Sequence, residues 1–227
     1  MLKKTLLAAA VFACATTAVQ ANEVSGYVTG SIGQAKADKP SVVKREMNEI
    51  KEFGGSTSTD RTDTAYKIAV GLQANPYVAL ELQYIDLGKS KYKGTESVPG
   101  YASYSEKIDF DTSGFGGNLV GTLPLDDFTL FAKVGYHYLK TKGSLKETLS
   151  GTGTGVGSLS ESGSDNVRKW TPSFGVGASY SITPELAVVA EYERYKGVAD
   201  KKVTIDDEKH SFKHDVDFAS VGLRYNF

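Results

Sequence analysis

The sequence predicts an all-β fold: an eight-stranded antiparallel transmembrane β-barrel with short periplasmic turns and long extracellular loops. Short stretches alternate apolar and polar residues, the connections between them alternate between short and long, and the last stretch ends on Phe227. Because backbone groups in lipid must hydrogen-bond internally, strands can span a membrane only as a closed barrel. The second face of each stretch is rich in Gly, Ser, Lys, Glu and Gln, which disfavours the apolar interior of a soluble lipocalin-type barrel.

The N-terminus predicts a secretory signal peptide over residues 1–21, followed by one barrel domain over residues 22–227. A basic start and a short apolar run precede the small-residue cleavage site Val19-Gln20-Ala21. The run is shorter than the about 20 apolar residues of a spanning helix. Cys14 allows an alternative lipoprotein cleavage, which the bulky Phe12 disfavours.

The parity of apolar residues places each strand in order. The first strand, about residues 23–36, has Val28, Gly30 and Ile32 on its outer face, and the fourth covers about residues 107–123. The outer faces of the others carry Tyr66, Ile68, Val70 and Leu72; Val78, Leu80, Leu82 and Tyr84; Leu130, Ala132, Val134, Tyr136 and Tyr138; Trp170, Phe174, Val176, Ala178 and Tyr180; Leu186, Val188, Ala190 and Tyr192; and Val221, Leu223, Tyr225 and Phe227.

Proline and Asx residues predict the short turns, at Asn75-Pro76, at residues 124–127 and at residues 183–185. The remaining connections predict four long loops. In the first, residues 42–53 have the charge and apolar spacing of one short helix. The second holds Tyr92, Tyr101 and Tyr104, which are interpreted either as exposed contact residues or as an upward extension of the membrane girdle. The third, about residues 143–166, is rich in Gly, Ser and Thr and is expected to be mobile.

Aromatic residues on the outer faces predict a membrane girdle. Trp170 and Tyr180 are separated by ten residues, or about 25 Å of height in a tilted strand, so they suit opposite interfaces. The expected girdle residues are Tyr84, Tyr136, Trp170, Tyr180, Tyr192, Tyr225 and Phe227.

The inner faces predict a charge network in the lumen, formed by Glu81, Lys133, Glu191 and Arg224, with His137 nearby. Unpaired charges are costly inside a narrow barrel, so opposite signs are expected to pair and block water flow. A solvated polar interior without a gating role is the alternative.

The segments Gly71-Leu-Gln-Ala-Asn75-Pro76-Tyr77, Tyr180-Ser-Ile-Thr183-Pro184-Glu185 and Ser220-Val-Gly222-Leu-Arg-Tyr225-Asn-Phe227 resemble the OmpA-like outer-membrane β-barrel family, which includes the small Opa/Ail-like barrels. The resemblance implies a narrow barrel plugged by charges. Glu81 matches a plug carboxylate, whereas Asn118, Ser179 and Val189 stand at the other matching positions. The chain ends at its last expected strand, so the cell-wall tethering of full-length OmpA is not implied.

The leading functional hypothesis is a structural or surface-interaction barrel, adhesive through its extracellular loops. A small-solute pore is the second hypothesis, and a lipid A-modifying enzyme the third. His137, His210 and His214 form no clear catalytic or metal motif, so no catalytic residue, metal or cofactor is predicted. The interspersed charges, with net charge −1, predict no nucleic-acid partner. The expected partners of this monomer are outer-membrane lipid, lipopolysaccharide, the barrel-assembly machinery and a host-surface ligand. Both termini are expected in the periplasm.

Overall fold

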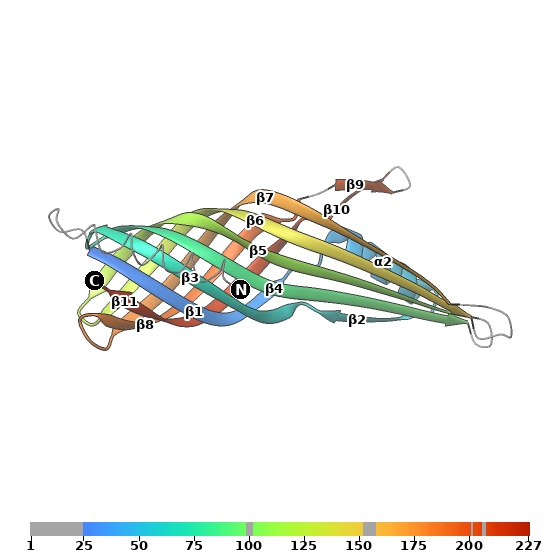
Figure 1. The fold of residues 1–227 in the computed structure, drawn as a ribbon, viewed down its shortest axis with the longest axis horizontal. Coiled ribbons are helices and arrows are strands. Elements are labelled where there is room, and N and C mark those ends of the chain that lie inside the picture. The colour runs from blue at the N-terminus through green and yellow to red at the C-terminus, as the bar shows by residue number, and fades with distance from the viewer. Residues whose placement is uncertain (1–24, 99–101, 152–157, 201, 206–207) are drawn as a thin grey trace, which may run out of the picture.

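A computed structural model describes residues 25–98, 102–151, 158–200, 202–205 and 208–227. The expected signal peptide lies outside these ranges. Figure 1 shows the elements, which are β1 (Ser25–Ala37), α2 (Ser41–Glu52), β2 (Ser56–Asp60), β3 (Thr62–Asn75), β4 (Val78–Val98), β5 (Ala102–Leu125), β6 (Phe128–Gly151), β7 (Ser158–Ser181), β8 (Leu186–Val198), β9 (Lys202–Ile205), β10 (Glu208–Ser211) and β11 (His214–Asn226).

Eight strands form a closed antiparallel ring, in the order β1-β3-β4-β5-β6-β7-β8-β11 and back to β1. The ring closes where β1 pairs with β11 over Tyr27↔Asn226 to Ala37↔Val216. Gly26 and Phe227 complete the seam by exchanging backbone hydrogen bonds of 2.9 and 2.8 Å. The predicted fold class is therefore confirmed.

The two faces of the ring differ as the parity of the strands predicts. On the outer face, Leu82 is 72% exposed and Val134 is 59% exposed, although both are apolar. The inner faces of the same strands carry the buried residues Glu81 and Lys133. A closed barrel with apolar residues outside and polar residues inside is the arrangement that suits lipid.

The short turns lie at the expected places. The turn after β3 is stabilised by Asn75, whose Oδ1 accepts a 2.8 Å hydrogen bond from the Tyr77 backbone N–H. Between β5 and β6 the turn is shorter than expected, because the strands pair as far as Leu125↔Phe128. Asp126 takes the positive φ of 53° that such a tight hairpin requires.

The second and third long connections consist largely of strands, because β4, β5, β6 and β7 continue far beyond the ring. Pairing extends to Val98↔Ala102 between β4 and β5 and to Ser150↔Ser158 between β6 and β7. We call this part, formed by residues 89–98, 102–112, 141–151 and 158–168, the protruding sheet. Figure 1 shows it tapering away from the ring on the right.

A β-bulge separates the protruding sheet from the ring on β4. The register with β5 shifts between Asp86 and Lys89, and Gly88 adopts a φ of 69°. Asp63 fixes the bulge by accepting a 2.8 Å hydrogen bond from the Lys89 N–H. The bulge reverses which alternate residues face inward, so Lys89 and Lys91 face outward whereas Tyr92 faces inward.

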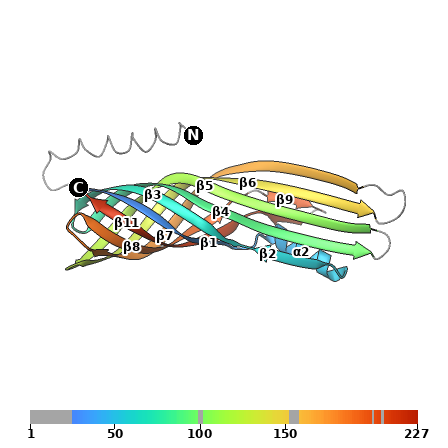
Figure 2. The ribbon, with the colours of Figure 1, turned by 60° about the horizontal axis from the view of Figure 1, so that its bottom comes forward.

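The predicted helix in the first long connection is confirmed as α2. Its buried residues are Val42, Val43, Met47 and Ile50, of which Val43, Met47 and Ile50 lie against the inner side of the protruding sheet near Tyr92 and Ile108. Figure 2 shows α2 beside β2 and the long strands. Val43 and Met47 form an apolar cluster with Tyr92 and Phe110. Among the described residues, no helix is long and apolar enough to cross a membrane.

Both tyrosine interpretations are wrong for Tyr92, which is 1% exposed beneath α2. Tyr104 is half-buried, and Tyr101 lies outside the described residues. The reason for the error at Tyr92 is the bulge, which turns its ring from the outer to the inner face.

The edges of the protruding sheet differ. On β4, the edge is covered by β2, which pairs over Ser56↔Thr95 to Asp60↔Lys91. On β7, pairing with β8 begins only at Ser173↔Tyr195. In the described part of the chain, residues 158–172 of β7 therefore have a strand partner on one side only.

Candidate functional site

The lumen holds a continuous chain of ion pairs around Lys133. Its Nζ lies 2.9 Å from Glu81 Oε1 and 2.7 Å from Glu191 Oε1. Lys67 Nζ extends the chain, because it lies 2.7 Å from both Glu191 Oε2 and Glu193 Oε2. These side chains come from β3, β4, β6 and β8, so the ion pairs connect strands across the lumen.

Of the expected network residues, Glu81, Lys133 and Glu191 come together and Arg224 does not join them by an ion pair. The Arg224 guanidinium instead lies 4.1 Å from the centre of the Tyr27 ring, and its Nε donates a 3.2 Å hydrogen bond to Thr29 Oγ1. The Tyr27 hydroxyl donates to Glu81 Oε2 at 3.2 Å. Arg224 is therefore connected to the carboxylate of Glu81 only indirectly, through the Tyr27 side chain that contacts both residues.

Sequence reasoning missed Lys67 and Glu193 as members of the network. The alternation of polar and apolar residues could have identified both. Lys67 lies on the polar face of its strand, and Glu193 lies on the same face as Glu191. Glu193 also accepts a 3.2 Å hydrogen bond from the Tyr195 hydroxyl. Among the matching positions of the family plug, Asn118 does take part, since its Nδ2 donates to Glu81 Oε1 at 3.0 Å.

Apolar layers enclose the charges on both sides. Toward the short turns, Tyr27, Ala79, Val120, Phe131 and Val189 form one buried cluster. Toward the protruding sheet, a second buried cluster includes Ile85, Leu139, Tyr195, Val216 and Phe218. Gly71 allows the Tyr27 ring to lie against the wall, since a Cβ there would overlap the ring. The lumen is therefore filled by side chains in layers rather than open as a channel.

His137 and Ser173 form the nearest approach to a catalytic pair, at 3.2 Å between Nδ1 and Oγ. His137 is fully buried above the ion pairs and packs edge-on against Tyr195, so the pair lies inside the filled lumen. His214, at the start of β11, is buried against Phe110. The side chain of His210 lies outside the described residues. The described residues contain no cluster suited to a metal ion.

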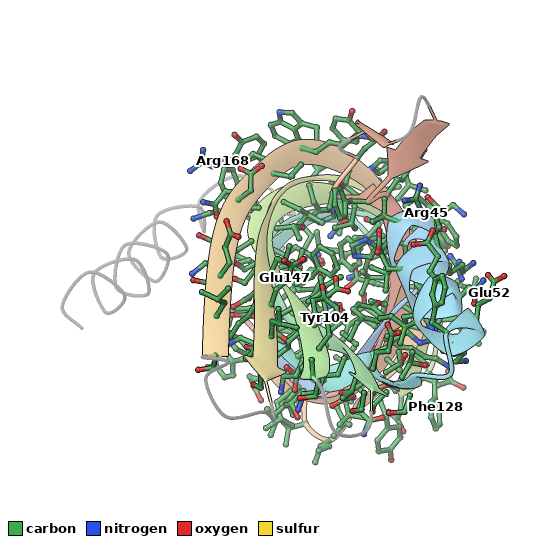
Figure 3. All side chains as sticks on the ribbon, turned by 90° about the vertical axis from the view of Figure 1, so that its right-hand side faces the viewer. Arg45, Glu52, Tyr104, Phe128, Glu147 and Arg168 are labelled. Atoms are coloured by element: carbon green, nitrogen blue, oxygen red, sulfur yellow. The ribbon has the colours of Figure 1, made fainter. Side chains whose placement is uncertain are left out.

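The expected girdle residues lie on the outer face of the ring, where each is between 37% and 54% exposed: Tyr84, Tyr136, Trp170, Tyr180, Tyr192, Tyr225 and Phe227. Along β6 and β7 they form separate groups. Trp170 stacks on Tyr136 with ring centres 5.4 Å apart, whereas Tyr180 contacts Phe128 with centres 4.8 Å apart. Figure 3 shows Phe128 pointing outward.

The two faces of the protruding sheet differ in charge: the inner face carries a row of glutamates, and the outer face carries lysines together with Asp109 and Asp111. Glu106, Glu147 and Glu161 lie directly opposite one another in one cross-strand row of the inner face. In the next row, Lys93, Lys107 and Lys146 lie opposite one another on the outer face. Figure 3, which looks onto the tips of the long strands, shows Glu147 and Tyr104 directed inward and Arg168 directed outward.

Burial is the main cause that raises the pKa of Glu106 from 4.5 to about 7, followed by the nearby carboxylates of Glu46 and Glu147. A folded-state pKa above the ordinary value means that the folded protein binds the proton more tightly than the unfolded chain. The packing between α2 and β5 around Glu106 should therefore be most stable at low pH, and should weaken as the pH rises from about 4.5 to about 7.

We expect the Glu106 carboxyl to titrate near pH 7 in ¹³C NMR spectra of the folded barrel. Glu147→Gln should lower this pKa, because it removes a neighbouring negative charge. Glu161→Gln is the matched control one strand further away, and should change the Glu106 titration less. An ordinary Glu106 pKa in the unsubstituted barrel would contradict the assigned burial.

A closed eight-stranded ring with an apolar outer face and a filled polar lumen defines a small transmembrane β-barrel. The family model described as "Outer membrane protein beta-barrel domain" matches residues 5–227. The chain belongs to this family of outer-membrane β-barrels.

Individual relatives are distant. A Coxiella burnetii protein without a functional description is 26% identical over 91% of this chain and 88% of its own length. Outer membrane protein A of Salmonella typhi is 27% identical over 69% of this chain, but the match spans only 38% of that protein. The crystal structure of Neisserial surface protein A is similar with a TM-score of 0.50 and 13% identity, over 91% of this chain and 100% of that chain. This last likeness concerns the fold alone.

Proposed function

We propose that this outer-membrane barrel makes contacts at the cell surface through its protruding sheet, and that the partner is an anionic polysaccharide such as those on host cells. The protruding sheet lies at the end of the ring opposite the short turns. By the asymmetry of outer-membrane barrels, this end is extracellular and both chain termini are periplasmic. The filled lumen makes a pore the weaker hypothesis.

The row formed by Lys93, Lys107 and Lys146 carries the proposal. Like charges directly opposite one another destabilise a sheet, so this row is unfavourable for the isolated protein. A polyanion lying across the strands would relieve the repulsion. Lys107 has a carboxylate partner at 2.8 Å in Asp109. Further basic residues, Lys91, Lys140, Lys142 and Arg168, are exposed on the outer face. Asp109 and Asp111 lie on the same face, opposite Lys91 and Lys142.

The protruding sheet also leaves one strand edge open to contacts beside the closed ring. Residues 158–172 of β7 present backbone groups that lack a second strand partner in the described structure. An exposed edge of this kind can pair with an extended segment of another molecule. The edge therefore supports a surface role beside that of the lysine row.

The test is binding of the refolded barrel to immobilised dextran sulfate, with uncharged dextran as the reference. Replacing Lys93, Lys107 and Lys146 together by Gln should weaken binding about a hundredfold, at about 1 kcal/mol for each lysine near an anionic surface. The matched control replaces Lys36, Lys44 and Lys51 by Gln, since these exposed lysines lie outside the row.

The control should bind nearly as well as the unsubstituted barrel, and salt should weaken both. Equal losses of affinity in the two triple variants would mean that binding depends only on the net charge of the protein, and would overturn the assignment of the binding site to this face. A second variant joins Gly143 to Asp165 through Asn-Gly in place of residues 144–164. It should still migrate as a folded barrel in unboiled gel samples but lose the binding. If it binds fully, another part of the surface carries the contact.

A further inference from the structure

An apolar pocket of about 280 Å³ lies on the inner face of the protruding sheet, opposite the side that carries the lysine row. Ile108, Phe110, Leu145 and Val167 contribute from β5, β6 and β7. Ala199 and Phe212, which flank the β9–β10 hairpin, close the opposite side. The exposed lining is mainly apolar, although Thr141, Ser144, Ser164 and Asp165 also border the pocket.

Glycines keep this pocket open. Gly143 and Gly163 both line it, and a Cβ added to Gly163 would meet no atom within 4 Å. A larger side chain at position 163 would thus occupy the pocket without displacing the wall. Apolar cavities of about 150 Å³ already hold a benzene ring, so this one has room for a ring with a short chain.

Carboxylates border the pocket on the side of the strand tips. Ile108, Leu145 and Gly163 form one cross-strand row, and Glu106, Glu147 and Glu161 form the next row on the same face. At about 3.3 Å per residue, the rows are about 7 Å apart along the strands. Glu106 is only 8% exposed. A molecule in the pocket therefore has mainly apolar surface around its body, with Asp165 in the lining and the carboxylates of the glutamate row near one end.

We propose that this pocket binds a small hydrophobic cation, with the apolar body between Phe110, Leu145 and Phe212 and the ammonium group beside Glu106 and Glu147. The charge of the row disfavours an anion of the same shape, and a neutral molecule gains nothing from the carboxylates. The proposal does not depend on polysaccharide binding, because the pocket and the lysine row lie on opposite faces of the sheet.

The probe is 2-phenylethylammonium, with 2-phenylethanol as the neutral analogue and 3-phenylpropanoate as the anionic one. The barrel is held in lipid nanodiscs, and binding is measured from the amide NMR shifts of Gly143 and Gly163. We expect saturable shifts with the cation, and affinities that fall in the order cation, alcohol, anion. Equal affinity of all the probes would overturn the proposal, since it would indicate apolar partition alone.

Gly163→Leu should abolish the saturable shifts of the remaining pocket amides. The matched control is Gly30→Leu, because an added Cβ at Gly30 also meets nothing within 4 Å but lies on the outer face of the ring. Glu147→Gln should weaken cation binding about two- to fivefold and leave binding of the alcohol unchanged. The proposal fails if Gly163→Leu binds like the control, or if Glu147→Gln affects the cation and the alcohol equally.

Discussion

A barrel that carries Lys133→Met is expected to lose about 3–5 kcal/mol of its free energy of unfolding. The Lys133 ammonium lies between Glu81 and Glu191, and its side chain is 1% exposed. Met retains most of the length and apolar surface of Lys but leaves these buried carboxylates without their shared partner. The cost arises from uncompensated buried charge, which is more destabilising than loss of the attraction alone.

Urea unfolding in lipid vesicles, followed by the gel shift of the folded barrel, measures this loss. Lys140→Met on the outer face of the same strand is the control, and should change stability by no more than about 0.5 kcal/mol. Adding Glu81→Gln to Lys133→Met should recover part of the stability, since it removes one of the unpaired charges. A loss of stability below about 1 kcal/mol for Lys133→Met would mean that water reaches these carboxylates. An increase in the conductance of the same variant would then support the pore hypothesis.

Val176→Arg should destabilise the folded barrel in lipid by about 2–4 kcal/mol, because its side chain would lie near the middle of the hydrocarbon layer. Val176 is 58% exposed on the outer face of β7 and lies between the aromatic residues Trp170 and Tyr180. The guanidinium group of an arginine at this position must either lose its hydration in the lipid or distort the bilayer to reach the interface.

The control for Val176→Arg is Ser160→Arg, on the same face of the same strand but in the protruding sheet. Ser160 is exposed, and the uninterrupted register of β7 with β6 fixes the shared face. Its substitution should alter the free energy of unfolding by about 0.5 kcal/mol or less. Similar effects at both positions in the same vesicle assay would contradict the assignment of the lipid-facing belt.

The ring itself could be predicted from sequence because one physical rule applies along each spanning strand. Lipid outside and a narrow lumen inside require opposite polarity at alternate positions. The neighbours Val134 and Lys133 are therefore sufficient to show which residues of β6 face the lipid and which face the lumen. Ile50 and Val43 similarly reveal α2 by helical spacing, because one side of the helix must be buried.

The protruding sheet could not be predicted in the same way, because no lipid surrounds it. Its outer face carries serine, threonine, lysine and aspartate, and on its inner face glutamates and glycines interrupt apolar residues such as Leu145 and Leu149. The bulge near Gly88 also reverses the parity of β4, which hid the inward position of Tyr92. In the lumen, parity placed Glu81, Lys133 and Glu191 on the inner face but could not specify which charges meet across it, and so it left Lys67 and Glu193 out of the network.

The ion pairs of the lumen also constrain how the barrel can assemble. Lys67 and Glu193 meet across 126 residues of sequence, and Arg224 meets Thr29 across 195. Such contacts between distant parts of the chain form slowly, because long loops must close before any contact is gained. An open sheet still leaves these charges in water, so their dehydration has to coincide with the joining of β1 to β11. Insertion should consequently be an all-or-none event, in which the last hydrogen-bonded seam and the burial of charge occur together.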